Sequence, residues 1–185
     1  NRIKSLCGLE HCPNLQTLLF SSNQIISLVE FDRFPNLQKL LCSDNQIISL
    51  CGLEHCSKLK ELDCSDNQII SLVGLEYCPN LEQLNCYDNQ ITSLVELEHC
   101  PNLQILDFDN NQITSLQPIL QLRRLTGLAI TDNPIEMTAQ TQNFIDRMRN
   151  RNKKHNIYSD TQNVHDSNIQ RSIFICIGNL LKDNI

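Results

Sequence analysis

The segment Leu37-Gln-Lys-Leu-Leu-Cys-Ser-Asp-Asn-Gln-Ile47 decides the fold of this 185-residue chain, because its pattern returns every 22 residues. Its asparagine belongs to a series with constant spacing, formed by Asn23, Asn45, Asn67, Asn89, Asn111 and Asn133. The leucines and the final isoleucine recur with the same period, as in the copy Leu81 to Ile91. A fixed period of 20 to 50 residues is the signature of a repeat architecture. The sequence therefore predicts a stack of similar units up to about residue 136.

The pattern within one unit predicts a short strand followed by a turn. Leu37, Leu40 and Cys42 have the spacing of side chains that point inward, and the residues between them point outward. One unit cannot bury its own apolar face, so neighbouring units stack and share a core. The asparagine amide can donate and accept hydrogen bonds, which suits it to satisfy the backbone of the turn after each strand. The apolar spacing in Leu53-Glu-His-Cys56 predicts a helical turn on the opposite side.

This repeat resembles the leucine-rich-repeat family in its 22-residue class, which phosphatase-regulator-like and internalin-like proteins share. The resemblance covers residues 1 to about 136. It implies an α/β repeat solenoid, a curved array with a parallel β-sheet on the concave face and short helical turns on the convex face. It also implies that the chain binds proteins, as most members of the family do.

The sequence predicts two parts with different organisation. Residues 1–136 form the leucine-rich-repeat solenoid, with about six repeats of which the first is truncated. Residues 137–185 comprise a C-terminal capping helix, a polar linker and a second amphipathic helix. We expect Phe144, Ile145 and Met148 to pack on the end of the solenoid. Because the array starts in mid-repeat, we also expect further repeats before residue 1 in the natural protein.

Ten cysteines are many for this length, and nine of them fall in columns, that is, at equivalent positions of successive repeats. The columns contain Cys42, Cys64 and Cys86; Cys12, Cys56, Cys78 and Cys100; and Cys7 and Cys51. Apolar residues replace cysteine elsewhere in each column, so we interpret the cysteines as small buried hydrophobic residues. Ten unpaired thiols predict a reducing compartment and hence a cytoplasmic location.

Other function classes find little support in the sequence. Residues 1–136 carry 8 basic and 17 acidic residues, a net charge of −9, which disfavours nucleic-acid binding. No apolar run is long enough to span a membrane. The histidines His11, His55 and His99 are two or more repeats apart, too far for one metal site. Without a phosphate-binding loop or catalytic motif, we expect no cofactor, no metal and no enzymatic activity.

The outward strand positions and the residues just after each strand form the candidate binding face. They vary more between repeats than the core positions do, and their centre is acidic with one tyrosine among the carboxylates. The candidate partner-binding residues are Lys39, Leu41, Glu61, Asp63, Asp66, Gln83, Asn85, Tyr87, Asp88, Ile105, Asp107 and Asp109. The acidic residues have two interpretations, recognition of a basic partner or simple solubility of the array.

The leading functional hypothesis is a scaffold or adaptor that binds a protein or peptide, with a basic one fitting the acidic face. The alternative is the substrate-recognition part of a larger enzyme or effector, such as a ubiquitin ligase, whose catalytic domain lies outside this chain.

Overall fold

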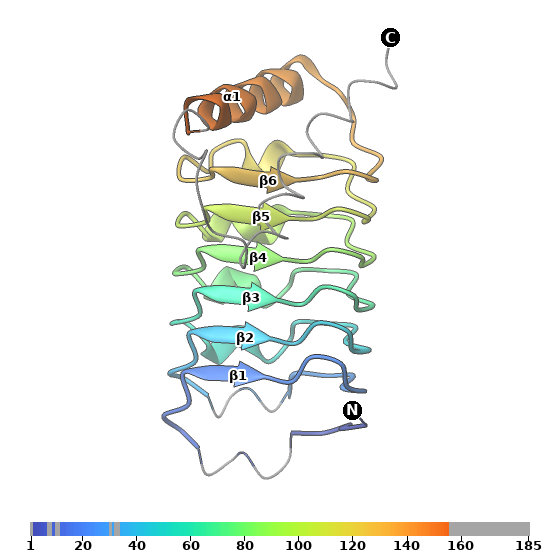
Figure 1. Ribbon diagram of the computed structural model, residues 1–185, viewed down its shortest axis with the longest axis vertical. Coiled ribbons are helices and arrows are strands. Elements are labelled where there is room, and N and C mark those ends of the chain that lie inside the picture. Colours follow the sequence, from blue (N-terminus) through green and yellow to red (C-terminus); the bar gives the residue numbers. More distant parts are fainter. Residues whose placement is uncertain (1, 7–8, 10–11, 30, 32–33, 156–185) are drawn as a thin grey trace, which may run out of the picture.

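The computed structural model describes residues 2–6, 9, 12–29, 31 and 34–155, with side chains described up to residue 150. Six short parallel strands form one sheet in the order β1 to β6 (Figure 1). Each strand contributes three residues, and consecutive strands pair in register with a constant offset of 22 residues, as in Leu40↔Leu62 and Leu62↔Leu84. The strands are Thr17–Leu19, Lys39–Leu41, Glu61–Asp63, Gln83–Asn85, Ile105–Asp107 and Gly127–Ala129.

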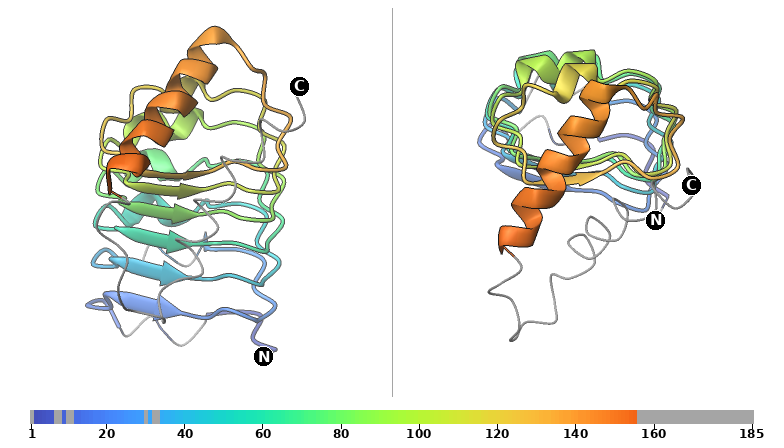
Figure 2. Two further views of the ribbon diagram at one scale, coloured as in Figure 1. Left: turned by 45° about the horizontal axis from the view of Figure 1, so that its top comes forward. Right: turned by 90° about the horizontal axis from the view of Figure 1, so that it is seen from above.

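The opposite side of the stack carries short 3₁₀ helices, which Figure 2 shows across the core from the strands. They are η2 (Leu53–His55), η3 (Leu75–Tyr77), η4 (Val95–His99) and η5 (Gln117–Ile119). The helical turn predicted at 53–56 is therefore confirmed. The α/β repeat solenoid predicted from the 22-residue period is also confirmed. The polar linker and the second amphipathic helix were predicted beyond residue 155, outside the described residues.

A single continuous core runs between the two faces from Phe20 to Met148. Leu40, Leu62, Leu84 and Leu106 point into it from the middle of their strands and are at most 1% exposed. Each repeat places its apolar side chains against those of the next, so no repeat has a core of its own. At the C-terminal end, the core is closed by Phe144, Ile145 and Met148 of the helix α1 (Ala139–His155).

The helix α1 caps the stack as the sequence predicted. Thr138 precedes it, and its Oγ1 accepts a hydrogen bond from the backbone N–H of Thr141 at 3.1 Å, the bond that a helix N-cap makes. The helix then crosses the end of the last repeat (Figure 2). Arg147 ties it to the repeat by donating from Nη2 to the backbone oxygen of Leu120 at 3.0 Å.

The asparagine series forms a hydrogen-bonded ladder inside the turns. Asn89 Nδ2 donates to the carbonyl oxygens of Cys86 and Tyr87 in its own repeat, at 3.1 and 3.2 Å. The same nitrogen lies 3.1 Å from the carbonyl oxygen of Cys64 in the preceding repeat. Its Oδ1 accepts from the N–H of Ile69, also in the preceding repeat, at 2.9 Å. One amide thus satisfies backbone groups of two repeats and joins them.

The cysteine columns have two different environments. Cys42, Cys64, Cys86, Cys56, Cys78 and Cys100 are fully buried, as predicted. The sulfur atoms of Cys64 and Cys86 touch at 3.3 Å, and all eight cysteines in the described residues are free thiols. Cys100 also donates from its sulfur to the carbonyl oxygen of Leu75 in the preceding repeat, at 3.3 Å. Cysteine therefore fills space and also satisfies the backbone of the neighbouring 3₁₀ turn.

The prediction of burial is wrong for Cys51 of the third column and for Cys12, whereas Cys7 lies outside the described residues. Cys51 is exposed, and the valines that share its column are 44–66% exposed. The preceding residue, Leu50, already fills the inward position, so Cys51 points to solvent. Cys12 lies in the first repeat and is also exposed. Apolar replacement within a column does not by itself indicate burial, because the flank of the solenoid carries aliphatic side chains as well.

We predict that replacing a ladder asparagine costs far more stability than replacing a surface asparagine. Asn89→Ala leaves the N–H of Ile69 without its acceptor and removes one of the two bonds that each of three carbonyl oxygens accepts. An unsatisfied buried N–H costs about 1–3 kcal/mol and the lost bonds to the carbonyl oxygens add to it, so we expect a loss of about 2–4 kcal/mol in the free energy of unfolding. Asn102→Ala is the control, since Asn102 makes one exposed bond to the Pro79 oxygen. Equal losses in urea denaturation would contradict the ladder's role.

We further predict that cysteine alkylation separates the two environments. Burial, with a smaller contribution from a nearby glutamate, raises the pKa of Cys56 and of Cys100 to about 12. Burial likewise raises the pKa of Cys42, Cys78 and Cys86. Since the thiolate is the reactive form, iodoacetamide at pH 8 should modify Cys12 and Cys51 at least about 100-fold faster than the six buried cysteines. Peptide mass spectrometry measures the rates. In urea the difference should disappear, and similar rates in the folded protein would refute the assignment.

Candidate protein-binding surface

The twelve candidate binding residues all lie on one side of the molecule. We call this side the strand face. It consists of the outward side chains of β1 to β6 and of the second and third residues after each strand, such as Tyr87 and Asp88 after β4. The register aligns Lys39, Glu61, Gln83 and Ile105 in one row. A second row contains Leu41, Asp63, Asn85 and Asp107. Tyr87 and Asp109 follow two residues after β4 and β5, and Asp66 and Asp88 stand in the turns at the same edge.

The aspartates in the turns have a backbone reason for being there. Ser22, Asp44, Asp66, Asp88, Asn110 and Asp132 all have a left-handed conformation, with φ between 51° and 58°. Among residues with a side chain, Asn and Asp adopt this conformation most readily. The interpretation of this column as one that varies to fit a partner is therefore incomplete. The turn selects Asp or Asn, although the carboxylates of Asp66 and Asp88 remain exposed.

Several polar residues of the strand face are held by hydrogen bonds to the turn that follows them. Asp63 Oδ1 accepts from the N–H of Ser65 at 3.1 Å, and Asn85 Oδ1 accepts from that of Tyr87 at 3.0 Å. Asp107 Oδ1 makes the same bond to the N–H of Asp109, also at 3.0 Å. Each bond orients its side chain along the face. Asp and Asn are equivalent in this bond, so the structure alone does not require the negative charge.

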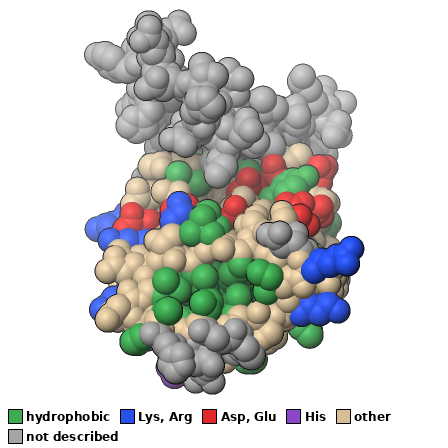
Figure 3. All heavy atoms as spheres, turned by 60° about the horizontal axis from the view of Figure 1, so that its bottom comes forward, with side chains coloured by type: hydrophobic (Ala, Val, Ile, Leu, Met, Phe, Trp, Pro, Cys, Tyr) green, Lys and Arg blue, Asp and Glu red, His purple; other side chains and the backbone are tan. Residues whose placement is uncertain are grey.

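The two ends of the strand face differ in accessibility. Leu19 is 60% exposed and Tyr87 is 41% exposed, whereas Asp107 and Asp109 are only 6% and 7% exposed. Leu41, Asp63 and Asn85 are half-buried between them. Figure 3 shows the molecule with its N-terminal end forward, where hydrophobic side chains cluster at the centre and acidic side chains gather beyond them. The accessible part of the candidate site is thus the region from β1 to β4 and the turn of Tyr87.

The charges of the face act on one another. Burial raises the pKa of Asp66, and the neighbouring carboxylates of Asp88, Asp44 and Asp63 add to this effect. Burial also raises the pKa of the Tyr87 hydroxyl, helped by Asp88 and Asp66. The most perturbed group is Asp107, where burial and the charges of Asp109 and Asp63 raise the pKa to about 6. In contrast, Lys39 Nζ lies 2.7 Å from Glu61 Oε1, so this acidic group is already paired.

The sequence analysis missed a second exposed surface on the flank of the solenoid. Ile26, Ile48 and Ile70 are 55–57% exposed, beside the exposed valines of the Cys51 column. Each is the second isoleucine of the sequence Gln-Ile-Ile, and the first isoleucine points inward. The pair of adjacent isoleucines was a usable signal, because neighbouring residues in an extended segment point to opposite sides.

Within the described residues, no three His, Cys, Asp or Glu side chains are grouped as metal ligands. No described helix has the length and apolar character needed to cross a membrane. The strand face presents hydrogen-bonding groups, aliphatic side chains and the aromatic ring of Tyr87.

Comparisons with known proteins agree with the fold. The family profile for Leucine Rich repeats (2 copies) matches residues 35–77, 57–99 and 79–121. No curated protein matches the chain. Many solved structures do, and among them is internalin InlF from Listeria monocytogenes, with a TM-score of 0.71 and 26% identity. That similarity covers 76% of this chain and 42% of the internalin, so the chain spans less than half of that protein.

Two further structures show the range of proteins with this fold. Internalin C2 from Listeria monocytogenes has a TM-score of 0.62 and 24% identity, covering 77% of this chain and 73% of that protein. The plant peptide hormone receptor RGFR1, solved in complex with RGF2, has a TM-score of 0.59 and 28% identity. Here the similarity covers 69% of this chain and 22% of the receptor.

The raised pKa of Asp107 generates a prediction about stability and pH. The folded chain holds the Asp107 proton more tightly than the unfolded chain, whose ordinary pKa is 3.8. Stability from this group is therefore greatest at low pH and decreases as pH rises through the window from about 4 to 6. We expect Asp107→Asn to raise the free energy of unfolding by about 1–2 kcal/mol at pH 7 and by little at pH 4. Asn85 shows that an amide makes the required hydrogen bond.

Urea denaturation of both proteins at pH 7 and pH 4 measures this effect. The control is Asp63→Asn, the equivalent change in β3, where the side chain keeps contact with solvent. A stabilisation by Asp107→Asn that is the same at both pH values would contradict the electrostatic explanation.

Proposed function

We propose that this chain, a leucine-rich-repeat protein, binds a protein or peptide on its strand face and acts as an adaptor or scaffold rather than as an enzyme. Leucine-rich repeats generally form interaction modules, and one structural neighbour is a receptor in complex with a peptide hormone. The strand face offers outward side chains on a sheet whose strands are paired in register. Because the core holds every strand in register, a partner would meet a preformed surface and lose little free energy to ordering it.

The observation that carries the proposal is the position of Tyr87. Its ring is 41% exposed in the middle of the array and stands beside the carboxylates of Asp66 and Asp88. Tyrosine is enriched among the residues that dominate binding energy, because it combines apolar area, a hydroxyl and few rotatable bonds. Nothing in the repeat pattern requires an aromatic residue here, since Ser21, Ser43 and Ser65 occupy the same column.

The chemistry of the face favours a partner segment with basic and apolar side chains. Asp88 lies next to Tyr87 in the same repeat, and Asp63 and Asp66 belong to the preceding repeat. Leu41 and Leu19 extend the surface toward the N-terminal end. Burial and the repulsion from Asp88, Asp44 and Asp63 raise the pKa of Asp66, and a lysine or arginine of the partner would relieve the repulsion. Such complementarity increases the association rate and excludes acidic competitors.

A cytoplasmic location belongs to the same proposal. Support comes from the six buried thiols, which occupy the core as hydrophobic residues and of which some, such as Cys78 and Cys100, also donate to backbone oxygens. In an oxidising compartment the unfolded chain would present ten thiols for incorrect pairing. Folding of this core is therefore compatible with a reducing environment.

The prediction uses substitutions that the repeats themselves show to be tolerated. The triple change Asp63→Asn, Asp66→Asn and Asp88→Asn removes three charges, while Asn85 and Asn110 demonstrate that asparagine fits both columns. We expect about tenfold lower recovery of the partner in affinity purification with quantitative mass spectrometry, since three charge pairs of about 0.5 kcal/mol each approach a factor of ten. Tyr87→Ala should produce a loss of similar size. Raising the sodium chloride concentration should reduce the loss caused by the triple variant and leave the loss caused by Tyr87→Ala unchanged.

A second triple variant controls for net charge. Glu82→Gln, Glu136→Gln and Asp146→Asn remove three charges that lie outside the candidate residues. This variant should retain full recovery of the partner. If the two triple variants, both folded by circular dichroism, recover the partner equally well, the strand face is not the binding site.

A further inference from the structure

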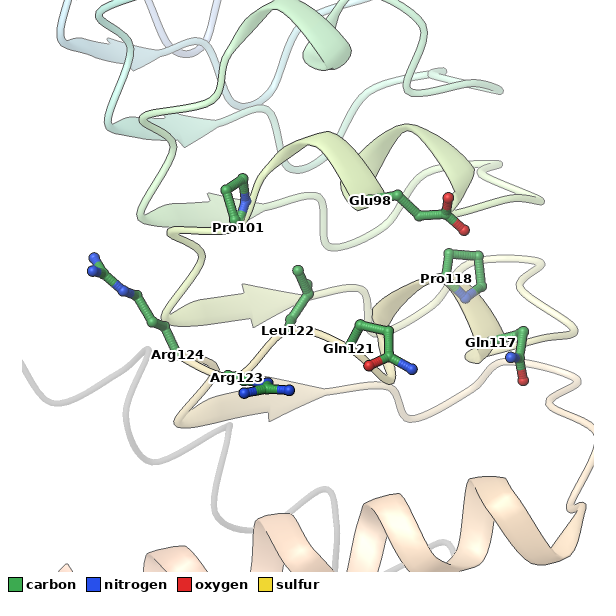
Figure 4. Close-up of a pocket in the computed structure, with 8 residues that line it drawn as sticks. All are labelled: Glu98, Pro101, Gln117, Pro118, Gln121, Leu122, Arg123 and Arg124. Atoms are coloured by element: carbon green, nitrogen blue, oxygen red, sulfur yellow. The ribbon is translucent and has the colours of Figure 1, made fainter.

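The 3₁₀ face contains a groove of about 570 Å³ between η4 and η5 (Figure 4). Its volume is within the range of about 300–1,000 Å³ that is typical of ligand sites. Pro101 and Pro118 form rigid apolar walls on successive repeats, and Leu122 closes the base between them. Figure 4 shows Arg123 and Arg124 at one end of the groove and Glu98 with Gln117 at the other. One end of the groove therefore carries positive charge and the other carries negative charge.

The groove lies where the sequence departs from the repeat. At the equivalent positions, three earlier repeats have Pro35-Asn36, Pro79-Asn80 and Pro101-Asn102, one has Ser57-Lys58, and the last has Arg123-Arg124. Lys58 still contacts the neighbouring repeat, because its Nζ donates to Asn36 Oδ1 at 2.7 Å. The asparagines of this column hold the neighbouring repeat, as Asn80 does by donating to the Ser57 oxygen at 2.8 Å. Arg124 occupies the position of these asparagines in the last repeat. Within the described residues, its exposed side chain makes no hydrogen bond or ion pair. The substitution therefore does not serve the stacking of repeats.

The charge of the groove is unusual for this molecule. Residues 1–136 have a net charge of −9, and Arg123-Arg124 is the one adjacent pair of basic residues among them. Arginine presents planar donors that match a carboxylate with two parallel hydrogen bonds. Between the arginines and Glu98, the proline walls leave an apolar stretch with the amide of Gln121 beside it. The groove thus combines a departure from the repeat pattern, a concave shape and a local positive charge.

We propose that this groove is a second interaction site, which binds an acidic peptide segment of a partner protein. A carboxylate of the segment pairs with Arg124, and an adjacent apolar side chain packs between Pro101 and Pro118. The acidic strand face on the opposite side of the solenoid would repel the same segment. The two surfaces therefore select partners of opposite charge, and one chain can join them.

The experiment is a selection of random twelve-residue peptides displayed on phage against the full chain. We expect enriched peptides that combine Asp or Glu with a neighbouring apolar residue. Synthetic copies should bind Arg124→Glu at least tenfold more weakly than the unchanged protein in fluorescence polarisation. Arg124→Gln, which removes the charge without reversing it, should give a smaller loss. Both variants alter an exposed side chain, and thermal unfolding verifies that they are folded.

Matched controls separate this site from the strand face. Lys60→Glu makes the same charge reversal at an exposed position outside the groove, and it should change peptide affinity less than twofold. The Asp63, Asp66 and Asp88 triple variant should bind the acidic peptides at least as tightly as the unchanged protein. The proposal is overturned if no acidic peptide is enriched, or if the enriched acidic peptides bind Arg124→Glu as well as the unchanged protein. Basic peptides that lose binding only to the triple variant would concern the strand face alone.

Discussion

The fold depends on how the turn after each strand satisfies its backbone. A short strand that ends inside a stack leaves carbonyl and N–H groups in the core, where water cannot reach them. From Asn45 to Asn133 the ladder asparagines solve this with one amide each, which donates to three carbonyl oxygens and accepts one N–H, as Asn89 does. Because two of these bonds reach the preceding repeat, the same residue sets both the turn and the spacing of the strands. The left-handed residue before each asparagine follows from this geometry, since it turns the chain so that the amide points inward.

Satisfying the backbone from within leaves the two outer faces free to differ. On the strand face, the outward side chains bond to the following turn or make single contacts with the next repeat, such as Lys39 with Glu61 and Asp109 with the N–H of Thr131. On the 3₁₀ face, the requirements are again local, and the surface asparagines that join repeats can be lost at the last repeat without opening the core. Acidic and basic surfaces can therefore coexist on opposite sides of one solenoid. The C-terminal helix limits this freedom at one end, where it must cover the core of the last repeat.

The sequence predicted the parts of the structure that the repeat constrains. Leu40 and its equivalents, the Asn45 series and the capping residue Phe144 each have one acceptable environment, so periodicity and residue type identify them. Cys51 and Ile26 were harder, because an aliphatic or sulfur side chain on the flank has the same composition as one in the core. The sequence analysis interpreted Asp66 only as a contact residue. A left-handed backbone conformation shows in the sequence only through the residue types at that position, here Ser, Asp and Asn. The groove beside Arg124 arises between two repeats and could not be read from either one. The twelve candidate residues do share one face, but periodicity alone does not indicate which of them a partner touches.

The parallel register has a consequence for how such a chain can change in length. Every ladder bond joins positions that are 20 or 25 residues apart between repeats, or 2 to 3 residues apart within one. An insertion of 22 residues copies all of these bonds intact, whereas an insertion of any other length within a turn breaks the amide contacts on both sides of it. Insertions and deletions that preserve the ladder therefore have the length of whole repeats. Whole repeats can be duplicated or deleted with little penalty, and each duplication would lengthen the strand face by one strand without altering the positions of the others.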